Sequence, residues 1–175
     1  TEAFLAGRMQ VLLLFGTNFI SSFADSNALA AGLARVGLVV SHDLFMNDTA
    51  RRFADIVLPG TAWLEELGCK MTNTHLYLME QALAAPGATR SLTWIVRALA
   101  DRLGLADFFP WPTEEAMIDA LLDHPATGHA TVAALRAQGG IGELRVSHVA
   151  HPDLRFSTPS GKVEFYSQRA VELGM

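Results

Sequence analysis

The first residues whose types suggest chemistry are Gly16, Thr17 and Asn18, which directly follow an apolar run. A glycine lets the backbone approach a ligand closely, and an asparagine amide can both donate and accept hydrogen bonds. The same residues also occur at strand-to-helix turns for conformational reasons alone, so both interpretations stay open. The chain has no Gly-x-Gly-x-x-Gly pattern and no phosphate-binding loop with its lysine, which disfavours an ordinary dinucleotide fold.

A second polar group, Ser41, His42 and Asp43, ends the apolar run that starts at Leu38. A carboxylate at such a position is suited to accept two hydrogen bonds from a guanine or ribose edge. Asp43 could equally cap the following turn, and the spacing alone does not decide between these roles. A Ser-His-Asp catalytic triad is disfavoured, because the side chains of three consecutive residues do not converge.

Other candidate catalytic and metal-binding residues are better explained as structural. Glu65 and Glu66 are adjacent, and neighbouring side chains on a helix point about a hundred degrees apart, so a solvated face is favoured. His148 and His151 have a spacing that suits a metal but lack a third strong ligand nearby, which favours a surface loop. The only cysteine, Cys69, has small and apolar neighbours typical of a packed side chain. The residues alone therefore indicate a ligand-binding edge and no catalytic centre.

The elements that position the two polar groups follow from the hydrophobic pattern. Three continuous apolar runs are typical of strands buried on both faces of a parallel sheet: residues 10–16, 38–41 and 55–58. Helical patterns separate these runs: residues 24–35 and residues 49–53, the second capped by Asp48. Ligands of such sheets bind beyond the carboxyl ends of the strands. We therefore expect residues 16–18, 41–43 and 59–61 to lie along one edge.

The remainder of the chain has a less regular pattern. Residues 61–67 are expected to form one or two helical turns, and Trp94 has a helical spacing typical of a core residue. Further expected elements are an extended segment at 75–81, helices at 92–103, 113–122 and 130–137, and strands at 144–149 and 162–166. We predict a Rossmann-like α/β domain at residues 1–110, with three layers formed by a parallel sheet and flanking helices. Residues 111–175 are predicted to form a helical and strand extension that is less regular.

The composition limits the classes of protein. A chain of 175 residues with 50% hydrophobic residues buries at most one domain and an appendage. Charged residues make up only 18%, so part of the apolar surface is expected to face a partner domain. A net charge of −5 with scattered basic residues disfavours a nucleic-acid groove, and no apolar run reaches the roughly 18 residues of a membrane span. The opening at Thr1 reads as the interior of a longer protein.

Several short segments together resemble the molybdopterin-dinucleotide oxidoreductases, the family of dimethyl sulfoxide reductase and formate dehydrogenase. Residues 13–18 resemble the strand that ends in Gly-x-Asn-Pro, and residues 39–50 resemble a segment with Asp, an aromatic residue and Thr-x-Thr-Ala. Residues 53–59 resemble the Ala-Asp-Ile-Val-Leu-Pro block, and residues 156–165 resemble a Thr-Pro-Ser-Gly-Lys segment. Each segment is modest, but their joint order is specific.

The resemblance implies that the chain is an internal fragment of a larger enzyme. In the family, two copies of molybdopterin guanine dinucleotide hold molybdenum or tungsten, and this domain contacts the nucleotide end of one copy. The metal's protein ligand and any iron–sulfur cysteines would lie upstream. The implied partners are the remaining domains of the polypeptide and electron-transfer subunits, in the bacterial cytoplasm or periplasm. The dinucleotide contacts carried over by position are Gly16, Asn18, Ser41, His42, Asp43 and Thr49.

Departures from the family pattern keep a second hypothesis open, a degenerate scaffold domain without cofactor in a respiratory electron-transfer complex. Phe19 stands where the family has Pro, and Asn47 stands where it has the first Thr of Thr-x-Thr-Ala. Glu66 replaces a Lys, and Leu92 an Asp or Asn, of some relatives. The retained segment at residues 158–162 argues against a degenerate role. An independent α/β hydrolase is disfavoured because the chain lacks a nucleophile elbow. In either case we expect no catalytic residue in this chain and no activity of the chain alone.

Overall fold

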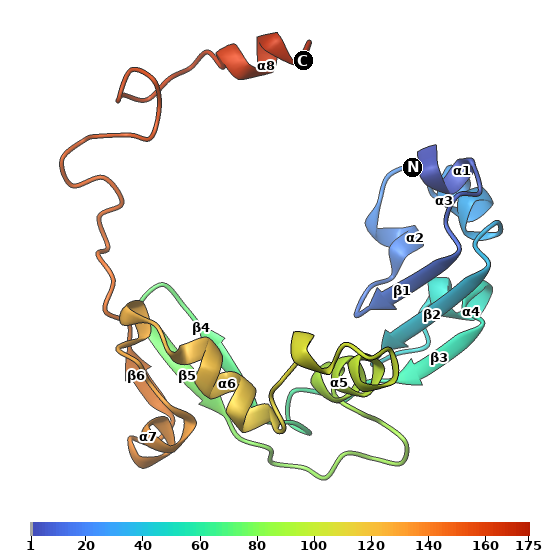
Figure 1. Cartoon of the computed structure of the whole chain (residues 1–175), viewed down its shortest axis with the longest axis horizontal. Helices are drawn as coiled ribbons and strands as arrows, with labels where there is room; N and C mark the ends of the chain where they lie inside the picture. Colours follow the sequence, from blue (N-terminus) through green and yellow to red (C-terminus); the bar gives the residue numbers. More distant parts are fainter. Residues whose placement is uncertain (1) are drawn as a thin grey trace.

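Residues 2–175 are described by a computed structural model with two separate three-stranded sheets (Figure 1). The first sheet is parallel, and its order is β1 (Val11–Phe15), β2 (Leu38–Asp43) and β3 (Ile56–Pro59). The second sheet is antiparallel, and its order is β4 (Gly68–Met71), β5 (His75–Met79) and β6 (Ile141–Glu143). The α/β fold class and the three parallel strands are thus confirmed, with small differences at the strand ends.

The short N-terminal helices pack on one face of the parallel sheet. These helices are α1 (Glu2–Leu5), α2 (Phe19–Ser22), α3 (Ser26–Leu33) and α4 (Asp48–Phe53). Leu12 of β1 packs into a cluster that contains Phe4, Ile20, Leu33 and Phe53, one from each of the four helices. Since side chains alternate along a strand, the buried Leu14 shares this face with Leu12. This face is the core of the N-terminal region.

The opposite face of the parallel sheet is only partly covered. Its apolar side chains include Val11, which is 53% exposed, Leu13, which is 43% exposed, and Ile56, which is 46% exposed. Helix α5 (Leu92–Arg102) lies beside the end of β3, where Leu58 and Ile95 line a common cavity. The sheet is therefore buried on one face and open over much of the other.

Polar side chains fix the start of β2 and of α4. Asp55 donates its backbone N–H to the Val39 carbonyl oxygen at 2.8 Å, and its Oδ2 accepts the Val39 N–H at 2.8 Å. Helix α4 is capped by Asn47, whose Oδ1 accepts the Ala50 N–H at 2.9 Å. The predicted cap, Asp48, is instead the first helical residue, where its negative charge suits the helix N-terminus.

The antiparallel sheet carries its own core. Helices α6 (Glu114–Leu122) and α7 (Val132–Ala137) contact it, and Leu76 of β5 packs with Ile118, Leu122, Val132 and Leu135. Strand β5 matches the predicted extended segment, whereas β4 was not predicted. The sheet joins strands from both sides of residue 110, through the pairing of β5 with β6. The division into domains at that residue stays a prediction.

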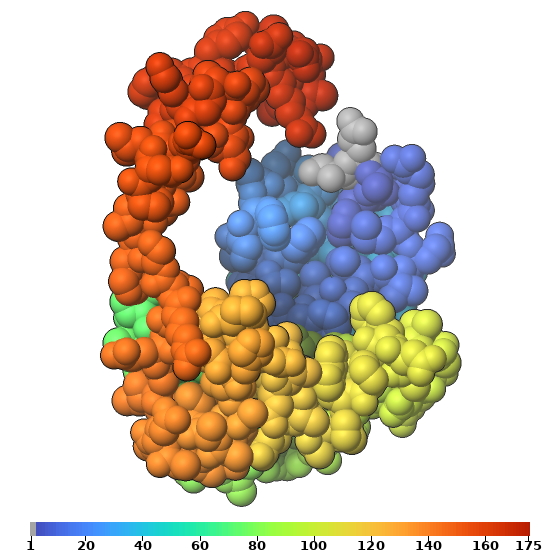
Figure 2. Space-filling model, turned by 60° about the vertical axis from the view of Figure 1, so that its left-hand side comes forward, coloured from blue at the N-terminus to red at the C-terminus, as the bar shows by residue number. Residues whose placement is uncertain are grey.

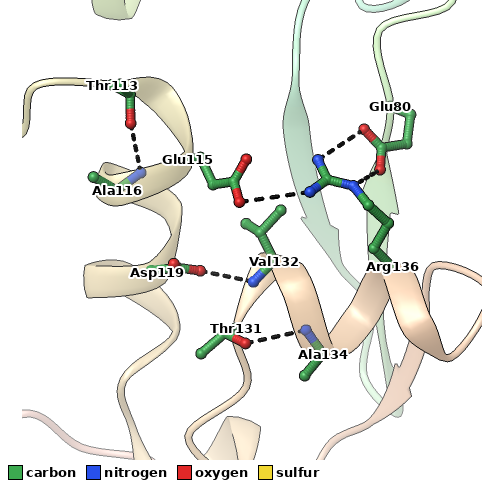
Figure 3. A network of polar contacts seen from close by, with 9 residues as sticks. All are labelled: Glu80, Thr113, Glu115, Ala116, Asp119, Thr131, Val132, Ala134 and Arg136. Carbon is green, nitrogen blue, oxygen red and sulfur yellow. Dashed lines mark hydrogen bonds and ion pairs between the residues drawn. The ribbon is translucent and has the colours of Figure 1, made fainter.

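A polar network at the surface joins α7 to α6 and to the residue that follows β5 (Figure 3). Arg136 donates from Nε to Glu80 Oε1 at 2.5 Å, and its Nη1 lies 3.5 Å from Glu115 Oε1. Asp119 Oδ1 on α6 accepts the Val132 N–H at 2.7 Å, which satisfies a donor in the first turn of α7. The hydrogen bond from Arg136 lowers the pKa of the Glu80 carboxyl below its ordinary value.

Three of the predicted elements are wrong. Residues 61–67 form turns rather than helix, because Glu65 Oε2 accepts the Ala62 N–H at 2.9 Å and closes a tight loop. Residues 144–149 and 162–166 contain no strand, since no neighbouring strand in residues 2–175 pairs with either segment. The strand near the first of them is β6, which lies just before it.

The chain ends in an extended arm. After β6 the chain leaves the antiparallel sheet and reaches α8 (Gln168–Glu172), which lies on the same side of the molecule as the N-terminus (Figure 1). Figure 2 shows open space between the arm and the N-terminal helices. Two single-turn 3-10 helices complete the elements: η1 (Ala106–Phe108) and η2 (Pro125–Thr127). No helix within residues 2–175 has both the length and the apolar character that a membrane span requires.

Candidate cofactor-binding edge

The carboxyl ends of the three parallel strands meet at one edge, and Gly16 is its most accessible predicted residue. Its N–H donates to the His42 carbonyl oxygen at 2.8 Å, which joins the end of β1 to the end of β2. Gly16 has a φ of +57° and is exposed, and a Cβ built there meets no atom within 4 Å. The backbone conformation favours glycine, and the space above it is open to a ligand.

A buried threonine links the turn after β1 to helix α4. The Thr49 hydroxyl donates to Asn18 Oδ1 at 2.8 Å and accepts the Ile20 N–H at 3.0 Å. Thr49 is 0% exposed, so its hydroxyl holds the Asn18 carboxamide from the buried side of the edge. The carboxamide nitrogen of Asn18 makes no hydrogen bond within residues 2–175, which leaves it available as a donor at the edge.

Asp43 is held by two donors at the end of β2. Its Oδ2 accepts from Asn47 Nδ2 at 2.8 Å, and its Oδ1 accepts the Phe45 N–H at 3.3 Å. Asn47 Nδ2 also lies 3.4 Å from the Thr17 carbonyl oxygen, so the carboxylate is connected to the turn after β1. Each carboxylate oxygen can accept more than one hydrogen bond, and Asp43 is only half-buried. It therefore combines a fixed orientation with remaining acceptor capacity.

Ser41 and His42 lie below this surface. Nε2 of His42 is 3.1 Å from the Arg90 carbonyl oxygen, and a Cβ at Gly60 would approach the same nitrogen to 3.1 Å. The ring is therefore enclosed by the loop after β3 and by residue 90, which bridges to Gly60. Ser41 is 1% exposed, and its Oγ has no hydrogen-bond partner within residues 2–175. An unpaired buried hydroxyl of this kind costs about 1–3 kcal/mol.

The six predicted site residues thus separate by depth. Gly16, Asn18 and Asp43 reach the edge, whereas Ser41, His42 and Thr49 support it from within. Their assignment as dinucleotide contacts stays a prediction for all six. Within residues 2–175, no three His, Cys, Asp or Glu side chains come together as metal ligands.

Sequence reasoning missed a cavity of about 350 Å³ beside the end of β3. Pro59, Arg90, Trp94 and Arg102 help to line it, and the Arg90 guanidinium lies 5.5 Å from the centre of the Trp94 ring. Trp94 was expected in the core but is 43% exposed. Its helical spacing identified α5 correctly, but the pattern could not show that the sheet beside α5 is open.

Comparisons with known proteins show the family of this chain and agree with its fold. The family model described as "Molybdopterin oxidoreductase" matches residues 2–102. The chain is 32% identical over 169 residues to the probable oxidoreductase YoaE of Bacillus subtilis, which covers 93% of this chain and 24% of that protein. It is 35% identical over 107 residues to a nitrate reductase of Klebsiella oxytoca, which covers 60% of this chain and 12% of that protein.

A solved structure gives the same result for the fold. Acetylene hydratase from Pelobacter acetylenicus superposes with a TM-score of 0.79 at 24% identity, over 99% of this chain and 24% of that chain. The chain therefore spans about a quarter, or less, of the length of these relatives. Because the family model matches more than half of the chain, this protein belongs to the molybdopterin oxidoreductase family.

Proposed function

We propose that this chain binds the nucleotide end of one molybdopterin guanine dinucleotide in a molybdenum or tungsten oxidoreductase. The observation that carries the proposal is Asp43, a carboxylate held by Asn47 and the Phe45 N–H at the carboxyl end of the central parallel strand. Ligands of open α/β sheets bind at that end of the strands. Relatives named as nitrate reductase and as F420-dependent formate dehydrogenase support the reaction class of the whole protein.

The residues at the edge fit the nucleotide part of this cofactor. A guanine edge presents N–H donors, which the unused acceptor positions of Asp43 can bind, and the carboxamide nitrogen of Asn18 can donate to an oxygen. The open space above Gly16 admits the backbone of a ligand close to the chain. Ser41, His42 and Thr49 would act by fixing the positions of these three residues.

The cofactor and the chain would contribute different parts of the reaction. The cofactor, when bound, supplies the redox chemistry, and the protein supplies binding and orientation. In our proposal this chain contributes anchoring contacts, while the groups that select the substrate belong to other parts of the full-length protein. Electron-transfer subunits are proposed partners of that full-length protein.

The test of this function is Asp43→Asn in the full-length protein, with Asp48→Asn as the matched control. Both variants remove one negative charge, but the Asp48 side chain is exposed on α4 and makes no hydrogen bond within residues 2–175. A hydrogen bond to a charged group contributes about 1.5–3 kcal/mol, so Asp43→Asn should weaken dinucleotide binding by at least about 10-fold and should retain less dinucleotide through purification than the control. Guanine nucleotide released by acid, with metal content, measures the occupancy of purified protein.

The outcomes separate the two hypotheses for the chain. Equal occupancy in Asp43→Asn and wild type, with unchanged melting, contradicts the contact. A wild-type full-length protein that contains neither pterin nor metal supports the degenerate scaffold instead.

A second prediction concerns the 175-residue chain by itself. We expect no catalytic activity and weak nucleotide binding. Binding costs entropy, and the few contacts that this chain offers must offset that cost without contacts from other parts of the full-length protein. Calorimetry with guanosine nucleotides checks this, and a dissociation constant in the micromolar range would contradict it.

A further inference from the structure

A cavity of about 400 Å³ lies beside β6 in the antiparallel region. The end of β6 and Arg145 line one side of it, and the loop at residues 127–130 and helix α7 line the other. Residues with polar side chains are frequent in its lining: Thr127, His129, Gln138, Glu143 and Arg145. None of the six predicted site residues takes part, so this cavity is separate from the candidate cofactor-binding edge.

The outer edge of β6 presents a backbone donor to this cavity. Strand β6 is the last strand of its sheet, so one row of its backbone groups faces no neighbouring strand. The Gly140 carbonyl oxygen accepts the Leu78 N–H at 2.8 Å. The Leu144 N–H donates to the Thr74 carbonyl oxygen at 2.9 Å, so the even residues face β5. Alternate residues of an antiparallel ladder point to opposite sides, and the Glu143 N–H therefore points outward, beside the cavity that Glu143 lines.

The loop beside β6 turns away from this edge after a single hydrogen bond. The Ala126 carbonyl oxygen accepts the Arg145 N–H at 2.7 Å. Gly128 and His129 follow with φ of +65° and +55°. Glycine adopts this backbone conformation without steric cost, whereas histidine is strained in it. The His129 N–H is held by the His124 carbonyl oxygen at 3.1 Å, so the strain is fixed into the bend beside the cavity. Strained residues of this kind concentrate at ligand sites.

The Arg145 guanidinium supplies a positive charge to the cavity. Its side chain makes no hydrogen bond or ion pair within residues 2–175. A Cβ at Gly128 would lie 2.8 Å from Arg145 Nε and 3.1 Å from Arg145 Cζ, so glycine leaves room for the guanidinium to lie against the loop. His129 Nδ1 is 2.6 Å from Asp123 Oδ1, which orients the imidazole and leaves Nε2 to contact a ligand.

We propose that this cavity binds a small organic carboxylate. The N–H groups of a guanidinium form a planar fork that matches the two oxygens of a carboxylate, and the outward N–H of Glu143 adds a further donor. Glu143 also carries a negative charge at this position, which disfavours a dianion such as phosphate. The proposal does not depend on the cofactor, because no residue of the candidate edge takes part in it.

Modification of the full-length protein with phenylglyoxal tests the site without any substitution. The reagent modifies exposed arginines, and mass spectrometry reports Arg145 and the equally exposed Arg155 separately. We expect propionate to slow the modification of Arg145 in a saturable manner and to leave Arg155 unchanged. Propionamide, which has the same shape without the charge, should protect neither residue. The proposal is overturned if propionate does not protect Arg145, if propionamide protects it equally, or if phosphate protects it at lower concentrations than propionate.

Arg145→Gln in the full-length protein measures the contribution of the guanidinium, with Arg155→Gln as the matched control. The Arg145 side chain makes no hydrogen bond within residues 2–175, so the substitution removes no bond that holds this region together. Saturation-transfer NMR of the propionate methyl group gives the dissociation constant. Loss of a charged hydrogen-bond partner should raise it at least about 10-fold in Arg145→Gln, while Arg155→Gln should match wild type. Equal dissociation constants in wild type and Arg145→Gln would contradict the proposal.

Discussion

The two sheets of this chain differ in how each obtains its core. The antiparallel sheet is covered by α6 and α7, and Leu76, Val132 and Leu135 are each at most 1% exposed. The parallel sheet packs α1 to α4 on one face and leaves Leu13 open on the other. The comparison shows that helices of this chain cover the core of the antiparallel region, whereas the parallel sheet, which carries the candidate site, is packed by helices on one face and is exposed over much of the other.

The largest expected effect tests the self-contained core. Leu135→Ala should lower the free energy of unfolding of the chain by about 2–5 kcal/mol, because a buried leucine loses its contacts and leaves a cavity. Leu121→Ala on α6 is the control, since Leu121 is 65% exposed. Urea denaturation measures both, and similar losses in the two variants would contradict an autonomous core in the antiparallel region.

An intermediate effect is expected beneath the candidate site. Thr49→Val keeps the shape of the side chain but leaves Asn18 Oδ1 and the Ile20 N–H without their partner, at a cost of about 1–3 kcal/mol. Thr93→Val is the control, because within residues 2–175 the Thr93 hydroxyl makes a single hydrogen bond, to the Met117 sulfur at 3.9 Å. If thermal melting shows equal losses, the buried hydroxyl does not fix the edge as we infer.

The smallest effect is expected at the surface of the antiparallel region. The pKa of Glu80 is lowered mainly by the hydrogen bond from Arg136, so this pair stabilises the fold above the ordinary carboxyl pKa. The contribution is lost as the pH falls through the lowered pKa of Glu80. In Arg136→Gln, NMR titration should show the Glu80 pKa returning toward its ordinary value. The distant change Arg155→Gln should leave it where it is, and an unchanged titration in Arg136→Gln would contradict the pairing.

The sequence was sufficient to predict the parallel strands, because each is a continuous apolar run with clear ends. The sequence did not predict β4, because that strand is short. It pairs with β5, which in turn pairs with β6 far along the chain. Residues 144–147 alternate in polarity as a strand would, yet pairing requires a neighbouring strand, which a local pattern cannot reveal.

The sequence predicted where the candidate site lies on the sheet, but it did not predict which of the site residues are buried. The apolar runs predicted that Gly16 and Asp43 follow neighbouring strands at one edge, and the register of the parallel sheet brings these strand ends together. The burial of Thr49 depends on how α4 packs beneath the turn after β1, which is a tertiary contact without a sequence signal. The role of Asn47 in holding Asp43 was likewise hidden, because a departure from the family pattern does not show its new partner.

The two hydrogen-bonding ends of Asn47 have a consequence for how this sequence can evolve. Its oxygen starts α4 through the Ala50 N–H, and its nitrogen holds the Asp43 carboxylate. A substitution to aspartate or serine preserves the helix start, but aspartate lacks the donor and serine has only one short hydroxyl for both tasks. Codon 47 is therefore under two selective constraints at once. Among homologues, replacement at this position should be epistatic with changes in the neighbouring loop at residues 44–46, which would have to supply another donor.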